Sequence, residues 1–368
     1  MSGDRVPFLD LATQHRMLLP EIMERWTVIA ENAAFVSGHW VEAFERRFAA
    51  MHGVRHCVAV ANGTDALELA LRALGAGPGD EVLLPTNSFI ATAEAVSNVG
   101  AVPVLVDCDR HSNIDASLIE SRASARTVGI IGVHLYGNPC DMDEINALAA
   151  RRGWWTMEDS AQGHLASYRG RMAGSLGRIA AFSFYPGKNL GAPGEGGAVT
   201  TDDDGLADTV RMLRNHGQSR KYESDVVGGN SRMPELVAAV LELKCSHLAG
   251  WTASRRAHAA AYRRLLAGSS VVETIDQQDD RESAVHLFVV HADRRDELAD
   301  HLSKAGIDTG RHYPIPIHRQ VAYAGARGAT GGFPVADLRA QRLLSLPMFP
   351  ELTDGQIDRV VEAIGSIR

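Results

Sequence analysis

Two side chains of this 368-residue chain have the chemistry of a carbonyl-transforming site. Lys188 lies on a loop after the apolar, aromatic run 179–185, and Asp159 ends the earlier apolar run 154–159. An amine held in a pocket can form a Schiff base with a carbonyl, and a carboxylate can keep a pyridine nitrogen protonated. The pair suits pyridoxal 5′-phosphate, whose ring withdraws electrons best when its nitrogen carries a proton.

The segments around these two residues must bring them together, and their pattern is that of parallel β-α units. Short apolar runs at 57–61, 81–84, 102–106 and 129–133 predict strands. Open α/β sheets place ligands at the carboxyl ends of strands, so Asp159 is expected at such an end. Further along, the pattern predicts a long helix over 234–262, a strand over 285–290 and a helix over 294–305.

Length and composition limit the class of protein. A chain this long exceeds one ordinary core, which predicts a large cofactor-binding domain over 1–245 and a small C-terminal domain over 246–368. The sequence has no apolar run of membrane-spanning length and opens on polar residues, so we expect a cytoplasmic protein with no membrane partner. The net charge of -8 argues against nucleic acid as a partner.

Cysteine and histidine spacing gives no sign of a metal site. The four cysteines are far apart in the sequence, which favours buried reduced thiols, and the fifteen histidines are dispersed. We therefore expect no bound metal.

Seven blocks of the sequence, in order, resemble the DegT-type nucleotide-sugar aminotransferases, a branch of the fold-type I pyridoxal phosphate enzymes. The blocks are residues 62–67, 85–92, 134–137, 158–162, 182–191, 229–232 and 312–314. The resemblance covers nearly the whole chain. It implies an α/β fold, with a large, mostly parallel sheet covered by helices on both faces and a smaller C-terminal α/β domain.

The resemblance also implies a role for individual residues. Lys188 would form the Schiff base with the cofactor and then move the proton during transamination. Asp159 would pair with the pyridine nitrogen, Gln162 would reach the phenolic oxygen and Phe89 would stack on the ring.

The cofactor phosphate would be held by residues from three blocks. Thr64 and Asp65 would offer backbone N–H groups at the start of the helix predicted over 65–74, where free amides and the helix dipole attract anions. Ser183 would add a hydroxyl. Asn230 would reach the phosphate of a neighbouring subunit, which implies a homodimer with shared active sites.

The implied reaction moves an amino group from L-glutamate to a keto-deoxyhexose carried on a nucleotide diphosphate, with dTDP preferred, at C-3 or C-4. The product would serve natural-product or surface-glycan biosynthesis. His312 and Tyr313 resemble residues that approach the sugar, and Arg220, Lys221 and Arg232 form a candidate pyrophosphate site. The order Gln162-Gly163-His164 and the pair Met233-Pro234 depart from the family pattern and leave the sugar open.

Other functions are open or disfavoured. Amination of a keto-inositol would use the same chemistry without a nucleotide, and a non-catalytic regulator could share the fold. A dinucleotide-binding enzyme is disfavoured because the loop 191–198 lacks Gly-x-Gly-x-x-Gly spacing. A P-loop enzyme is disfavoured because Asn189, and not Ser or Thr, follows Lys188.

Overall fold

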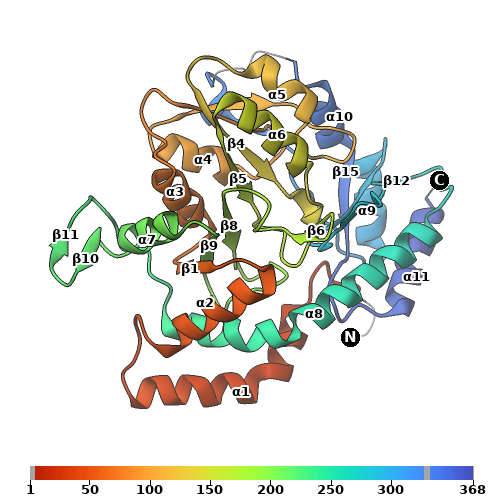
Figure 1. Ribbon diagram of the computed structural model, residues 1–368. Coiled ribbons are helices and arrows are strands. Elements are labelled where there is room, and N and C mark those ends of the chain that lie inside the picture. The colour runs from red at the N-terminus through yellow and green to blue at the C-terminus, as the bar shows by residue number, and fades with distance from the viewer. Residues whose placement is uncertain (1–4, 327–331, 368) are drawn as a thin grey trace.

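The central sheet carries the predicted strands in a mostly parallel arrangement (Figure 1). The computed structural model describes residues 5–326 and 332–367, and within them the order of this seven-stranded sheet is β1-β9-β8-β5-β4-β2-β3. The strands are β1 (His56–Val60), β2 (Glu81–Pro85), β3 (Val102–Val106), β4 (Thr127–Val133), β5 (Trp155–Asp159), β8 (Ile179–Ser183) and β9 (Gly197–Thr201). Strand β9 is antiparallel to both of its neighbours, and the other pairings are parallel.

Alternating side chains bury both faces of this sheet. In β2, Val82 and Leu84 contribute to one apolar core and Leu83 to another, as the two-residue period of a strand requires. Helices of the first face are α3 (Gly63–Ala73), α4 (Ala91–Asn98) and α7 (Asp204–Leu213). Helices of the second face are α2 (His39–His52), α5 (Ala116–Arg122), α6 (Met142–Arg152) and α8 (Glu235–Leu265). The predicted helix-covered sheet is therefore confirmed.

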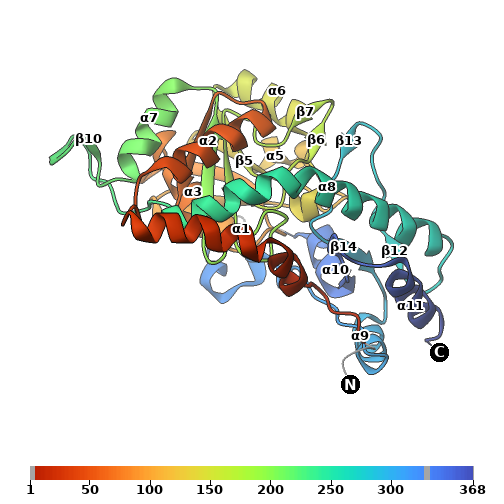
Figure 2. The same cartoon turned by 90° about the horizontal axis from the view of Figure 1, so that it is seen from below.

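A smaller unit forms around a second, antiparallel sheet of β12, β14 and β15. Its elements are β12 (Glu273–Thr274), β14 (Phe288–His291), α9 (Arg295–Lys304), α10 (Pro334–Arg342), β15 (Leu343–Leu346) and α11 (Asp354–Gly365). Val6 joins its core and pairs with Ile307, and both ends of the chain lie on this side of the molecule (Figure 2). The predicted domain boundary after Cys245 falls inside α8, and the division at that residue remains a prediction.

The remaining elements are short, apart from the first helix. Helix α1 (Leu11–Glu31) packs along α8 (Figure 2). The short elements are η1 (Leu135–Gly137), β6 (Ser167–Tyr168), β7 (Arg171–Met172), β10 (Gln218–Arg220), β11 (Glu223–Ser224), β13 (Arg281–Glu282), η2 (Ile317–Arg319) and η3 (Val321–Tyr323). Among the described residues no helix combines the length and apolar character needed to cross a membrane.

The start of one predicted strand shifts because the residues before it make long-range contacts. The strand predicted over 285–290 begins only at Phe288, because Val285 has a left-handed backbone (φ 47°). The residues before β14 instead bond to the loop after β4: the N–H of Ala284 donates to the Gly137 carbonyl at 2.9 Å, and that of His286 to the Tyr136 carbonyl at 2.9 Å. These hydrogen bonds join the small unit to the loop that follows the carboxyl end of β4, next to the end of β5 where Asp159 lies.

Candidate active site

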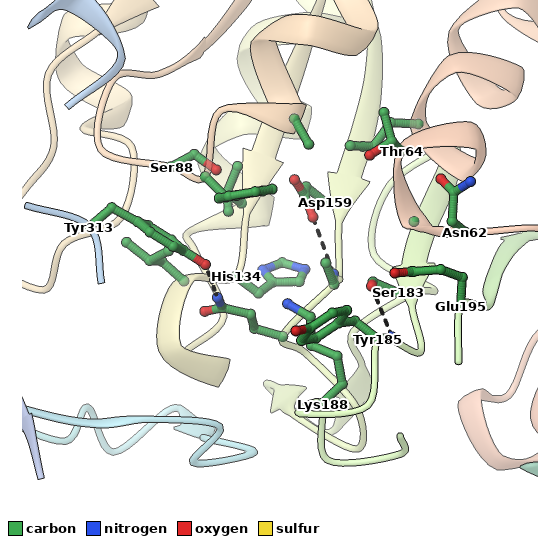
Figure 3. A pocket seen from close by; sticks show the side chains of 18 residues that line it. Asn62, Thr64, Ser88, His134, Asp159, Ser183, Tyr185, Lys188, Glu195 and Tyr313 are labelled. Carbon is green, nitrogen blue, oxygen red and sulfur yellow. Dashed lines mark hydrogen bonds between the residues drawn. The ribbon is translucent and has the colours of Figure 1, made fainter. Parts of the chain in front are cut away.

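A cavity of about 700 Å³ lies where β2, β4, β5 and β8 end (Figure 3). Residues predicted for the site make up much of its wall. Those that line it are Thr64, Phe89, Asp159, Gln162, Ser183, Lys188 and Tyr313. The main sheet and the segment after α9 thus bring together side chains that are far apart in the chain, from Thr64 to Tyr313.

Asp159 is held in a fixed orientation at the end of β5. The residue is 6% exposed, its Oδ2 accepts a 2.8 Å hydrogen bond from Thr92 Oγ1, and its Oδ1 accepts one of 3.2 Å from the Ala161 N–H. Thr92 is itself 2.7 Å from the Ser88 hydroxyl. These hydrogen bonds fix the orientation of the carboxylate, which lines the cavity.

Lys188 reaches the same cavity from the loop between β8 and β9, and Figure 3 shows its amine directed inward. Burial lowers the pKa of Lys188 to about 8, and the nearby negative charge of Asp159 opposes that shift. An amine with this pKa is partly neutral near pH 7, which is the form that attacks a carbonyl.

Gln162 links the cavity floor to the small unit. Its Oε1 accepts a 2.6 Å hydrogen bond from the Tyr136 N–H, and its Nε2 donates at 3.1 Å to the hydroxyl of Tyr313. The Tyr136 hydroxyl in turn donates at 2.7 Å to the His312 carbonyl. The ring of Phe89, 51% exposed, lies 5.3 Å from that of Tyr313 between centroids. Two neighbouring aromatic side chains therefore border the cavity that Asp159 also lines.

The start of α3 and the end of β8 meet in a tight corner of the cavity. A Cβ on Gly63 would lie 2.5 Å from the Cβ of Ser183, so only glycine permits this close approach. The Asp65 N–H donates at 2.8 Å to Asn62 Oδ1, the helix N-cap. Thr64 and Ser183 therefore face the cavity, whereas the Asp65 amide is already paired. The corner, the inward lysine and the oriented carboxylate fit pyridoxal phosphate: Thr64 and Ser183 would hold its phosphate, Phe89 would stack on its ring and Asp159 would pair with its ring nitrogen.

The predicted residues that do not line this cavity in the single chain are Asp65, Arg220, Lys221, Asn230, Arg232 and His312. Arg220 and Lys221 are exposed on the β10–β11 hairpin, which projects from the body (Figures 1 and 2). Asn230 is exposed and pairs with Asn215, whose Oδ1 accepts a 2.6 Å hydrogen bond from Arg232. His312 lines a smaller adjoining cavity of about 220 Å³.

Sequence reasoning missed several residues of the wall. They are Asn62, Ser88, His134, Tyr185 and Glu195, together with Thr92 and Tyr136 behind the wall. Ser88 and Thr92 both stand in the block 85–92, but Ser88 precedes α4 and only Thr92 lies in it, so no helical spacing predicted their contact. His134 is buried, with Nε2 2.8 Å from a Glu158 oxygen and Nδ1 accepting from the Cys140 N–H at 3.2 Å.

Comparison with known proteins gives one family over nearly the whole chain. The model of the DegT/DnrJ/EryC1/StrS aminotransferase family matches residues 18–365. The dTDP-3-amino-3,4,6-trideoxy-alpha-D-glucose transaminase of Streptomyces venezuelae is 45% identical, over 98% of this chain and 95% of that protein. The UDP-N-acetyl-3-dehydro-alpha-D-glucosamine 3-aminotransferase of Acidithiobacillus ferrooxidans is 44% identical, over 98% of this chain and 97% of that protein.

A solved structure has the same fold. DesV of S. venezuelae, in complex with a ketimine intermediate, superposes with a TM-score of 0.96 at 45% identity, covering 99% of this chain and 98% of that one. This agreement confirms the aminotransferase fold predicted from the sequence.

Proposed function

Because the chain belongs to the DegT/DnrJ/EryC1/StrS aminotransferase family, we propose that it uses pyridoxal phosphate to transfer an amino group from L-glutamate to a nucleotide-linked keto-deoxyhexose. The observation that carries this proposal is the presence of Lys188 and the oriented carboxylate of Asp159 in one cavity. The family model and the two relatives described above are named as aminotransferases, which supports catalysis over a non-catalytic regulator.

When bound, the cofactor withdraws electrons from the carbon that exchanges its amine. Asp159 keeps the ring nitrogen protonated, and Thr92 holds the carboxylate in place. Lys188 Nζ carries the proton between the substrate carbon and the cofactor, a task suited to a pKa of about 8. Gln162 fixes the cavity floor through Tyr136 and Tyr313. Thr64 and Ser183 anchor the phosphate end.

The proposed acceptor is a dTDP-linked 3-keto sugar. Support comes from the two relatives, whose names describe transamination at C-3 of hexoses carried on dTDP or UDP. Both align with this chain almost end to end. The alternatives to a dTDP-linked 3-keto sugar are a 4-keto sugar, aminated at C-4, and a keto-inositol.

We also propose a homodimer with shared active sites. Asn230, Arg220 and Lys221 lie outside their own cavity and are exposed, so in the proposal they serve the site of a second copy. The projecting hairpin places the two cations beyond the body of the subunit (Figure 2). The cytoplasmic location expected from the sequence stays a prediction.

Product analysis tests the proposed reaction. The protein, loaded with pyridoxal phosphate, is incubated with L-glutamate and either a 3-keto or a 4-keto dTDP-6-deoxyhexose, and the sugar is followed by mass spectrometry. We expect the amino sugar and one equivalent of 2-oxoglutarate from the 3-keto substrate. Calorimetry with dTDP separates the alternatives, because a keto-inositol enzyme has no reason to bind a nucleotide.

A further inference from the structure

A second cavity of about 220 Å³ adjoins the first and shares Tyr185, Lys188 and Tyr313 with it; we call it the side pocket. Its wall combines the N-terminal segment, the Lys188 loop, α8 and the small unit. Its remaining lining residues are Phe8, Leu9, Gly187, Arg255, His286, Leu287, His312 and Met348. It therefore opens beside the lysine that our proposed function places at the reacting carbon.

Arg255 gives the side pocket a buried positive charge. The residue is 3% exposed and lies on α8. Its Nη1 donates to the carbonyls of Val285 at 3.3 Å and Met348 at 3.0 Å, whereas its Nε has no hydrogen-bond partner among the described residues. Burial lowers the pKa of Arg255 to about 10, so the guanidinium remains charged at neutral pH. A buried guanidinium with an unpaired donor favours an anionic ligand.

No acidic side chain lines the side pocket beside Arg255. The charge of Glu351 acts on Arg255, but no carboxylate among the described residues forms a hydrogen bond or an ion pair with the guanidinium. A ligand carboxylate can therefore still bind Arg255 directly.

Two histidines supply neutral polar contacts on the same wall. His312 Nδ1 is 2.9 Å from Ser345 Oγ, and His286 Nδ1 is 3.2 Å from Asn189 Oδ1. Burial and the charge of Lys188 lower the pKa of His312 to about 4, so this ring is neutral at physiological pH. In each ring Nε2 is the nitrogen that remains to contact a ligand.

We propose that the side pocket receives a carboxylate of the amino donor, with Arg255 as the countercharge and His286 and His312 as hydrogen-bond partners. The inference rests on the proposed function, which brings the donor carbon to Lys188. Leu9, Leu287 and Met348 give the methylene stem of such a donor an apolar wall. A volume of about 220 Å³ suits a carboxylate on a short stem, whereas a nucleotide sugar requires the larger cavity.

Glutarate, a dicarboxylate that has no amine to transfer, tests the side pocket without catalysis. Calorimetry on the protein loaded with pyridoxal phosphate should show that glutarate binds and competes with L-glutamate. Arg255→Lys should weaken glutarate binding at least tenfold, because lysine lacks the guanidinium fork. Arg256→Lys is the matched control, since its neighbouring guanidinium binds the Ser283 and Leu165 carbonyls outside the pocket. Wild-type protein that does not bind glutarate overturns the inference, whatever the variants do.

Two further measurements complete the test. One identifies which carboxylate of the donor occupies the side pocket, and the other does not depend on whether Arg255→Lys folds. If the α-carboxylate occupies the side pocket, Arg255→Lys slows the first half-reaction with both L-glutamate and L-alanine; if the distal one does, only L-glutamate is affected. A folded Arg255→Lys that slows neither contradicts the inference. His312→Gln, which can keep the Ser345 contact, should raise the glutarate Kd about threefold even if Arg255→Lys does not fold. If no amino donor alters the cofactor spectrum while glutarate still binds, the proposed function fails and the anion site stands.

Discussion

The hydroxyl of Thr92, in the first turn of α4, donates a 2.8 Å hydrogen bond to Oδ2 of Asp159 at the end of β5. Both residues are buried, so the bond is shielded from water and holds the carboxylate in one direction. The α4 helix therefore sets the position of the acid on which the proposed chemistry depends.

Replacing Thr92 by valine keeps the volume and removes this donor. A hydrogen bond to a charged group is worth about 1.5–3 kcal/mol, so we expect Thr92→Val to weaken pyridoxal phosphate binding or lower kcat about tenfold or more. Thr200→Val is the control, because that hydroxyl bonds the Gly174 carbonyl at 2.8 Å away from the cavity. Equal cofactor affinity and kcat in Thr92→Val and wild type would show that the bond does not position Asp159.

Asp159→Asn tests the charge itself. The amide keeps the shape but cannot hold the pyridine nitrogen protonated, so kcat should fall about a hundredfold while the variant still binds the cofactor. Stopped-flow measurement of the glutamate half-reaction gives the rate directly. A loss smaller than about threefold would assign Asp159 a packing role only.

The low pKa of Lys188 predicts how the cofactor-free protein captures pyridoxal phosphate at different pH values. The reactive form is the neutral amine, and lowering the pKa of a base makes that form available at lower pH. The capture rate should therefore rise with pH up to about 8 and then level off. A rate that continues to rise to about pH 10, as for an exposed lysine, contradicts the buried environment. Lys188→Met, which lacks the amine, gives the background rate of pyridoxal phosphate capture by other lysines.

Gly63→Ala tests the contact between α3 and β8. The new methyl group would lie 2.5 Å from the Ser183 Cβ, which forces the helix start away from the strand. We expect the free energy of unfolding to fall by about 1–3 kcal/mol and the Kd for pyridoxal phosphate to rise at least about tenfold. Gly355→Ala is a matched first-turn control in α11, because nothing lies within 4 Å of its added Cβ. If both variants bind the cofactor like wild type, the corner does not hold the phosphate.

Much of the fold could be predicted from local sequence patterns. Strand β3 has the predicted bounds of residues 102–106, because both of its faces are buried and the apolar run is continuous. The long helix α8 was predicted over 234–262 and observed as Glu235–Leu265. The start of β14 could not be predicted, since it depends on hydrogen bonds to Tyr136 and Gly137, about 150 positions earlier.

The residues that carry the proposed chemistry could be predicted because they stand in sequence motifs. The residues that hold them in position could not be predicted as well. Lys188, Asp159 and Gln162 stand in the quoted blocks and meet in the cavity. The supporting contacts of Thr92 and Tyr136 are tertiary, and no local pattern specifies them. Arg220 and Asn230 do not line the cavity of their own subunit. Their contribution to the cavity of a partner subunit remains a proposal.

The absorption spectrum of the purified protein with pyridoxal phosphate, recorded before and after addition of L-glutamate, tests the central claim most directly. We predict a yellow cofactor band that bleaches when L-glutamate is added and returns with a keto-sugar acceptor. Lys188→Met, as the control, should show neither the protein-bound band nor the bleaching. A folded wild-type protein whose band L-glutamate leaves unchanged would contradict the proposed transamination.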